Sequence, residues 1–124
     1  MAFPRGGFRV GEFVKGDVVV VPFPFSDLSA SKRRPALVLA KASENELILA
    51  QITSKSFFDS YAIEIDSSSF ESGGLNVLSN IRTNKLFTAE RRILLYKAGA
   101  LKQEKMTETI KVIVELLTRD STTH

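Results

Sequence analysis

The strongest constraint on the fold is a run of four valines, residues 18–21, between the pair Gly16 and Asp17 and two prolines. β-branched side chains favour extended backbone, and a continuous apolar run is typical of a strand that is buried on both faces. Proline has no backbone N–H to donate to a neighbouring strand, so Pro22 or Pro24 is expected to end this one. The segment therefore predicts a buried strand that begins at a turn.

Further short strands are predicted along the chain, separated by residues that favour turns. Residues 61–65 alternate strictly, as in a half-buried antiparallel strand. The other expected strands are residues 34–40 and 45–52, joined as a hairpin through 41–45, and then 76–82 and 93–99. Residues 24–34 are expected to be a loop and residues 67–74 a long turn.

From Lys102 to Thr118 the apolar period changes to that of a helix, with Met106, Ile110, Ile113 and Leu117 on one face. Additional apolar residues at positions 112, 114 and 116 widen that face, so the helix is expected to cover the sheet, a dimer interface, or both. Strands followed by one helix predict a mainly β (α+β) chain. The expected architecture is a small, strongly bent antiparallel sheet or partial barrel with the C-terminal helix packed on it.

Length and composition fit one cytoplasmic domain. The chain has 124 residues, of which 44% are hydrophobic, enough for one core. We expect an N-terminal arm over residues 1–14 and a single domain over 15–120. There is no cysteine, the first residues lack the apolar core of a signal peptide, and the longest uncharged apolar run is far shorter than the roughly 20 residues that span a bilayer.

The charge balance is mildly basic, +3 with a pI near 9.3. The basic residues gather at 32–34 and again at Arg82, Lys85, Arg91 and Arg92. If the fold brings these clusters together, they would form a positive surface that attracts phosphates.

The inventory of side chains excludes several chemistries. The single histidine is His124, the last residue, so a histidine acid–base pair is not expected. Without cysteine, a zinc site of the usual ligands is not expected either, and the spacing of the aspartates gives no magnesium motif. No phosphate-binding glycine motif is present. We therefore expect no metal and no cofactor.

Cleavage of RNA by its own 2′-hydroxyl suits the side chains that remain. The substrate supplies the nucleophile, so the protein needs to align the attack, stabilise the charge on the phosphorus centre and help a proton reach the leaving 5′-oxygen. The planar fork of arginine binds two phosphate oxygens at once.

Three separated segments resemble the MazF/PemK/Kid toxins of type II toxin–antitoxin systems, which are ribonucleases that cut mRNA at short single-stranded sequences. The segments are KGDVVVVPFPFSDLSASKRRPALVLA, AQITSK and IRTNKLFTAERRIL, in that order. The resemblance runs from about Lys15 to Leu94 and implies a small SH3-like fold of the PemK/CcdB type. It also implies a metal-independent, sequence-specific endoribonuclease that leaves a 2′,3′-cyclic phosphate.

The resemblance also implies roles for individual residues. The catalytic arginine of the family falls on Arg34, which would stabilise the phosphate and help move the proton, and its active-site threonine falls on Thr53. Pro35 would stiffen the entry to the second strand and bias Arg34 away from helical backbone. The residues expected to steer or position RNA are Lys32, Arg33, Arg82, Asn84 and Lys85.

Asn84 departs from the family pattern, because some members have an acid at this position. An amide orients a hydroxyl but does not accept its proton at neutral pH. Three alternatives stay open for the general base: Arg34 works with solvent, a loop acid such as Asp27 takes the part, or catalysis is slower than in members with the acid.

The expected partners are single-stranded mRNA, a cognate antitoxin protein and a second copy of the chain in a homodimer, with no membrane. Two alternatives remain open beside the ribonuclease. One is a toxin that binds gyrase without cutting nucleic acid, as the related CcdB toxins do. The other is a catalytically weakened RNA-binding relative, an alternative that stays open because Asn84 stands where some family members have an acid.

Overall fold

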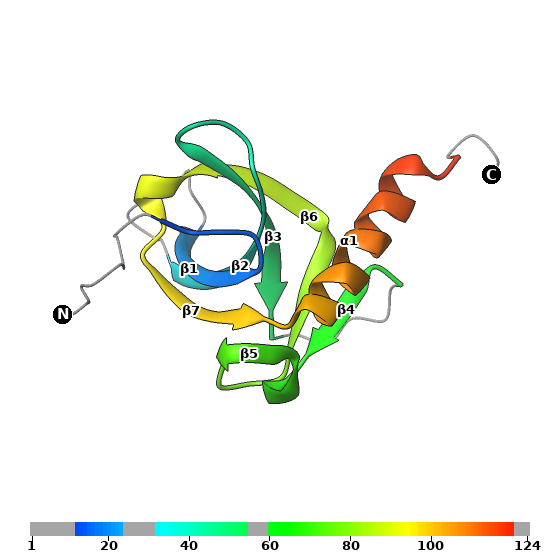
Figure 1. The fold of residues 1–124 in the computed structure, drawn as a ribbon, viewed down its shortest axis with the longest axis horizontal. Helices are drawn as coiled ribbons and strands as arrows, with labels where there is room; N and C mark the ends of the chain where they lie inside the picture. The colour runs from blue at the N-terminus through cyan, green and yellow to red at the C-terminus, as the bar shows by residue number, and fades with distance from the viewer. Residues whose placement is uncertain (1–11, 24–31, 55–59, 121–124) are drawn as a thin grey trace.

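Seven antiparallel strands form one sheet, which curls into a half-barrel with a single helix at its side (Figure 1). The structure is a computed structural model and describes residues 12–23, 32–54 and 60–120. The strand order across the sheet is β4-β6-β3-β2-β1-β7-β5. In chain order the strands are β1 (Asp17–Phe23), β2 (Lys32–Lys41), β3 (Glu46–Thr53), β4 (Ala62–Ile65), β5 (Phe70–Gly73), β6 (Ser79–Glu90) and β7 (Tyr96–Leu101).

The valine run forms the centre of β1, and both of its faces are buried, as predicted. Val18 belongs to a core that lies between the sheet and the helix, with Leu37, Ile52 and Met106. Val19 and Val21 belong to a second core on the other face of the sheet. Because consecutive side chains of a strand point to opposite faces, a strand between two cores has to be apolar at every position.

The strand β2 begins earlier than the sequence predicted. Lys32, Arg33 and Arg34 are exposed, but they are paired with β1 and are not part of a loop. Val21 pairs with Arg34 and Pro22 with Arg33 in this ladder. The ladder therefore fixes the backbone of all three cations. The predicted hairpin between β2 and β3 is confirmed.

Two other segments differ from the prediction. Residues 67–74, expected to be a long turn, contain the 3₁₀ helix η2 (Ser67–Ser69) and the strand β5. The strand expected over residues 76–82 begins at Ser79 and continues to Glu90 as β6. β6 is followed by the 3₁₀ helix η3 (Arg91–Ile93) and by β7, which starts three residues later than predicted.

The helix α1 (Gln103–Thr118) has the predicted extent. It packs beside β6 and β4 (Figure 1), and Met106 and Ile113 enter the first core. Leu117, predicted on the same face as Met106 and Ile113, is 69% exposed, at the end of the helix that extends away from the sheet (Figure 1). No helix in the described residues is long and apolar enough to cross a membrane.

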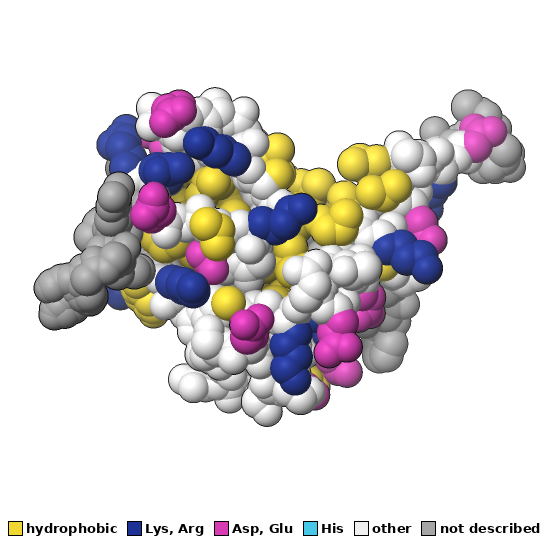
Figure 2. Space-filling model, viewed as in Figure 1, with side chains coloured by type: hydrophobic (Ala, Val, Ile, Leu, Met, Phe, Trp, Pro, Cys, Tyr) yellow, Lys and Arg dark blue, Asp and Glu magenta, His cyan; other side chains and the backbone are white. Residues whose placement is uncertain are grey.

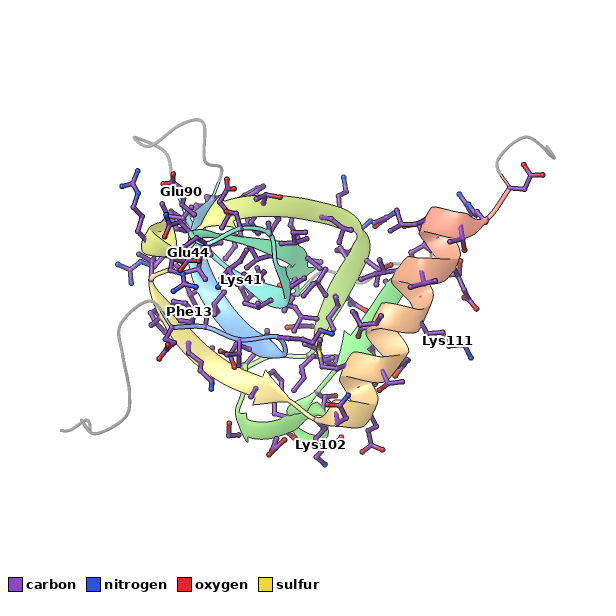
Figure 3. The ribbon with its side chains drawn as sticks, turned by 45° about the horizontal axis from the view of Figure 1, so that its top comes forward. Phe13, Lys41, Glu44, Glu90, Lys102 and Lys111 are labelled. Carbon is purple, nitrogen blue, oxygen red and sulfur yellow. The ribbon has the colours of Figure 1, made fainter. Side chains whose placement is uncertain are left out.

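The segment before β1 is attached to the barrel. Phe13 packs in the second core, at the end of the barrel that also carries Lys41, Glu44 and Glu90 (Figure 3). The backbone N–H of Val14 donates to the Asp17 carboxylate over 2.9 Å. These contacts fix residues 13 and 14 against the start of β1.

Candidate active site

The strand register places several polar side chains on one face of the sheet. Side chains directly opposite each other in a ladder point to the same face. Arg34 is opposite Val21, so it shares a face with the second core. One row on that face runs across four strands, from Val19 through Ala36 and Gln51 to Arg82.

Thr53 lies on the same face, because it follows Gln51 by two residues in β3. It is half-buried and pairs with Asn80, which is buried in β6. Extending the β2–β3 register by two residues would bring Arg34 opposite Thr53. The chain therefore places the arginine and the threonine at the same end of adjacent strands.

An irregularity in β6 supplies two more cations. Ala50 pairs with Leu86, but its neighbour Gln51 pairs with Arg82, so residues 83–85 bulge out of the β3–β6 ladder. Thr83, at the start of this bulge, is fully buried, and its hydroxyl donates to the carbonyl of Tyr61. Bulges of this kind change the direction in which neighbouring side chains point. Here Arg82 and Lys85 both reach the same pocket.

This pocket, called the first pocket below, has a volume of about 270 Å³. Its polar part comes from Arg34, Gln51, Thr53, Arg82 and Lys85, and its apolar part from Val21, Phe23, Pro35, Ala36, Ile52 and Phe87. Three cations, a hydroxyl and an amide around an apolar wall are suited to an anion that is joined to an aromatic or apolar group.

A second pocket of about 350 Å³ adjoins the first, and the two share Arg34, Pro35, Ile52 and Thr53. Lys32 and Arg33 line the second pocket, together with Ser54, Leu75, Asn76, Val77 and Ser79. Arg34 and Thr53 therefore stand between two hollows at the end of β2 and β3.

The structure brings together most, but not all, of the predicted site residues. Asn84 is exposed on the bulge and lines neither pocket. The two basic clusters meet only in part, because Arg91 and Arg92 lie in η3, where Arg92 pairs with Glu90. The loop residue Asp27 lies outside the described residues.

Sequence reasoning did not assign a role to Gln51, Phe87 or Asn76. Gln51 was recognisable in principle, since it lies two residues before Thr53 and so on the same face. Phe87 follows the bulge, and Asn76 approaches the site from the β5–β6 connection, so both depend on tertiary structure. In the described part of the chain, no group of three acidic, histidine or cysteine side chains is placed to hold a metal ion.

The sequence from residue 14 to residue 117 matches a family model described as PemK-like, MazF-like toxin of type II toxin–antitoxin system. The chain belongs to this family. A search of curated protein sequences gave no match.

Solved structures share the fold of this PemK-like chain at low sequence identity. The Mycobacterium tuberculosis toxin MazF-mt6 is 18% identical, with a TM-score of 0.65 over 84% of this chain and 98% of the other. MazF from Deinococcus radiodurans is 17% identical, with a TM-score of 0.67 over 87% and 100%. An endoribonuclease from a mycobacterial species, solved in complex with its cognate antitoxin, is 12% identical, with a TM-score of 0.68 over 88% and 98%.

Proposed function

We propose that this PemK-like chain is a metal-independent endoribonuclease that cuts single-stranded mRNA, and the toxin of a type II toxin–antitoxin pair. The observation that carries the proposal is the convergence of Arg34, Thr53, Arg82 and Lys85 on one pocket with an apolar wall. Three cations give the charge that a phosphodiester needs, and the wall gives a surface for a base.

In the proposed reaction the 2′-oxygen of the substrate attacks the adjacent phosphorus, and the bond from phosphorus to the 5′-oxygen breaks. The products are a 2′,3′-cyclic phosphate and a 5′-hydroxyl, which takes up a proton. No water molecule is consumed in this step. The protein has to bind the phosphate, hold the 2′-oxygen in line with the leaving oxygen, and manage two proton transfers.

Arg34 would stabilise the charge that develops on the phosphate oxygens. Its backbone is fixed on one side by the ladder with Val21 and on the other by Pro35, which sets the direction in which the side chain leaves the strand. A preorganised donor stabilises a transition state without reorganisation during the reaction. A proton transfer from this arginine to the leaving oxygen is part of the proposal.

Thr53 would donate its hydroxyl to the same phosphate, and Arg82 and Lys85 would bind the neighbouring phosphates. The amide of Gln51, between Arg82 and Ala36 on the sheet, can both donate and accept. Gln51 therefore suits the 2′-hydroxyl or the edge of a base. The general base stays unassigned.

The aromatic side chains of the first pocket give it a place for a nucleobase. Phe23 and Phe87 line the pocket together with Val21. Stacking on an aromatic side chain contributes about 1–3 kcal/mol per base in single-strand binding proteins. We place the base on one side of the scissile phosphate against Phe87.

We also propose a homodimer and an antitoxin as partners. The helix α1 exposes Val114 and Leu117 on one stripe, and hydrophobic side chains gather in the notch between the sheet and the helix (Figure 2). Apolar stripes of this kind are usually covered by a partner.

The antitoxin would lie across the basic pockets, where an acidic segment complements Arg33, Arg34 and Arg82. An mRNA substrate would be met in the cytoplasm, which is where we propose that the protein acts.

The test is incubation of the purified protein with a long RNA in excess EDTA, with mapping of the cuts and of the new ends. Discrete cuts with 2′,3′-cyclic phosphate ends are expected. Arg34→Ala is expected to lower the rate at least about 100-fold, the scale on which loss of one preorganised donor acts. Thr53→Ala is expected to lower it by a smaller factor.

Matched controls are Arg92→Ala and Thr88→Ala, which remove the same side-chain types at exposed positions outside both pockets. Both controls are expected to cut at the rate of the unaltered protein. A folded, antitoxin-free protein that leaves RNA intact would overturn the proposal. Full activity of Arg34→Ala would overturn the mechanism.

A further inference from the structure

The connection between β5 and β6, residues 74–78, exposes apolar side chains close to the proposed active site. Val77 is 58% exposed and Leu78 is 54% exposed, and Asn76 between Leu75 and Val77 is exposed as well. Large apolar side chains on a surface segment are a cost to solubility unless they contact a ligand or a partner.

This connection is held in one shape by contacts with β7 and β6. Gly73 has a φ of 64°, and a Cβ atom there would lie 2.2 Å from the carbonyl oxygen of Ala98. The N–H of Gly74 donates to that same oxygen over 3.1 Å. At the other end the Ser79 hydroxyl donates to the carbonyl of Val77 over 3.0 Å. The exposed side chains are therefore presented by a preformed segment, which lowers the entropy lost on binding.

The same segment forms one wall of the second pocket. Leu75, Asn76 and Val77 line it together with Lys32 and Arg33, and the pocket shares Arg34 and Thr53 with the first one. A pocket that combines apolar side chains, an amide and cations suits a nucleotide, in which a base is joined to an anionic phosphate. A purely apolar peptide would leave Lys32 and Arg33 without anionic partners.

We propose that residues 74–78 are a specificity element that contacts one nucleobase of the RNA. This inference rests on the proposed function. The scissile phosphate lies over Arg34 and Thr53, the base on one side of it lies in the first pocket against Phe87, and the base on the other side lies in the second pocket. There the amide of Asn76 binds the base edge, and Leu75 and Val77 contact its face.

An amide suits this task because it presents one acceptor and two donors in a plane. A side chain that makes a good pair of hydrogen bonds to a base edge discriminates against the wrong base by about 1–3 kcal/mol in DNA complexes. That energy corresponds to about 5-fold to 150-fold in relative cutting rate. Loss of the Asn76 amide is therefore expected to change which sequences are cut more than how fast cutting proceeds.

The experiment uses a pool of RNA with a randomised segment, in which each cut position is sequenced for the unaltered protein and its variants. Asn76→Ala is expected to lower base preference about 10-fold at one position, on one side of the cut. Phe87→Leu is expected to alter preference on the opposite side. Val77→Ala is expected to weaken, without abolishing, preference at the Asn76 position.

The matched control is Asn45→Ala, an exposed asparagine in the β2–β3 hairpin that lines neither pocket. It is expected to leave the whole pattern unchanged. An unchanged pattern in Asn76→Ala, with the unaltered protein active, would overturn this inference and leave the proposed function standing. The inference would also be overturned if Asn76→Ala kept the same cut pattern but bound a cognate antitoxin differently. That result would identify the segment as an antitoxin contact. Absence of cutting by the unaltered protein would overturn both.

Discussion

Gln51 stands opposite Arg82 in the β3–β6 ladder, although the residue before Gln51 pairs with Leu86. The residues Thr83, Asn84 and Lys85 are therefore accommodated outside the ladder. Without this bulge, a register continued from Ala50 would place Lys85 opposite Gln51. With it, both Arg82 and Lys85 line the first pocket. The bulge therefore lets β6 contribute two cations to the first pocket, where a regular strand would place one opposite Gln51.

The anchor of this bulge gives the first prediction. Thr83 is fully buried, and its hydroxyl and its backbone N–H both donate to the carbonyl of Tyr61. Thr83→Val keeps the shape and removes the hydroxyl, so we expect a loss of about 1–2 kcal/mol in the free energy of unfolding. We also expect slower RNA cutting, because Arg82 and Lys85 are displaced. Urea denaturation and the cutting assay measure the two effects.

Thr88→Val is the control for this change, since Thr88 is exposed in the regular part of β6. Its effect on unfolding is expected to stay within about 0.5 kcal/mol. Equal stability of the Thr83 and Thr88 variants would show that the buried hydroxyl does not anchor the bulge.

The sequence predicted those parts of the fold in which one local pattern decides the structure. The valine run and the alternation of residues 61–65 both form strands, because their side chains meet a core on the expected faces. The helix was predicted to within one residue, since its apolar period is uninterrupted. In these segments local propensity and tertiary packing favour the same state.

The segments that were missed depend on long-range contacts. The bulge in β6 shifts the apolar alternation out of phase, so residues 83–90 gave no strand pattern. The strand β5 has four residues, of which only Phe70 is buried, and it is held by pairing with β7. Arg34 and Thr53 were predicted from a family resemblance, whereas Gln51, Phe87 and Asn76 enter the two pockets through strand register and loop placement.

The second prediction concerns an ion pair at the start of β1 in which the carboxylate is buried and the cation is partly exposed. Lys97 Nζ lies 3.2 Å from Asp17 Oδ1, and the Asp17 side chain is only 4% exposed. Lys97→Met removes the cation and leaves a buried carboxylate with the Val14 N–H as a neutral donor, which is costly. We expect the free energy of unfolding to fall by about 1–3 kcal/mol, since Lys97 itself remains partly solvated.

Lys41→Met provides the comparison for Lys97, because the Lys41–Glu44 pair is exposed on both sides. Exposed pairs contribute little, so its effect is expected to stay below about 0.5 kcal/mol. If both methionine variants unfold at the same urea concentration, the pair with the buried Asp17 carboxylate contributes no more to the free energy of unfolding than the exposed Lys41–Glu44 pair.

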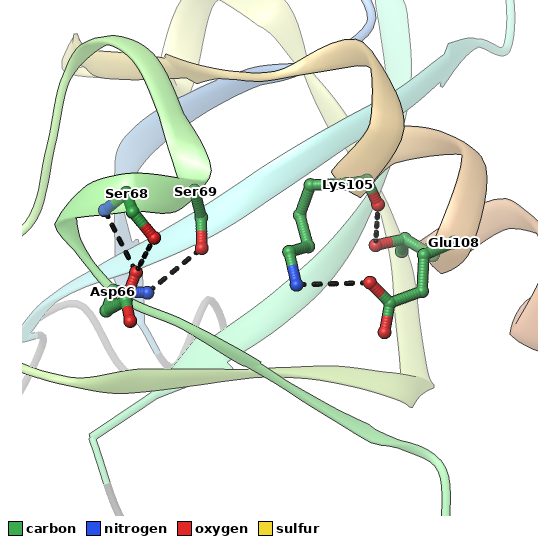
Figure 4. A network of polar contacts seen from close by, with 6 residues as sticks. Asp66, Ser68, Ser69, Lys105 and Glu108 are labelled. Atoms are coloured by element: carbon green, nitrogen blue, oxygen red, sulfur yellow. Dashed lines mark hydrogen bonds and ion pairs between the residues drawn. The ribbon is translucent and has the colours of Figure 1, made fainter.

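The third prediction concerns Asp66, which caps η2. The Ser68 hydroxyl and N–H both donate to its carboxylate, and Asp66 N–H donates to the Ser69 hydroxyl (Figure 4). The Ser68 hydroxyl, followed by the Ser68 N–H, lowers the pKa of Asp66 below its usual value of 3.8. As the pH falls, the unfolded chain therefore takes up this proton first.

The stabilisation by the Asp66 carboxylate is consequently complete above the unfolded pKa and is lost as the pH falls through the lowered, folded pKa. Asp66→Asn is expected to have a lower thermal midpoint than the unaltered protein at pH 7, and the difference is expected to narrow as the pH falls below the usual pKa of 3.8. Glu71→Gln, at an exposed position in β5, is the control. A difference between the Asp66 proteins that stays constant from pH 7 to pH 3 would contradict the role of the charge.

The last prediction tests whether α1 mediates the proposed homodimer. Ile110, Val114 and Leu117 lie on one stripe of the helix, which is half-buried at Ile110 and 69% exposed at Leu117. Leu117→Glu would place a charge in a buried apolar contact if a second copy covers this stripe. The dissociation constant of the dimer is therefore expected to rise at least about 10-fold.

Leu95→Glu, at another exposed leucine in the turn between η3 and β7, is the control and is expected to remain dimeric. Sedimentation velocity over a range of concentrations distinguishes the two variants. A Leu117→Glu protein that sediments as the unaltered dimer would exclude the end of α1 from the interface and direct attention to the other exposed apolar side chains.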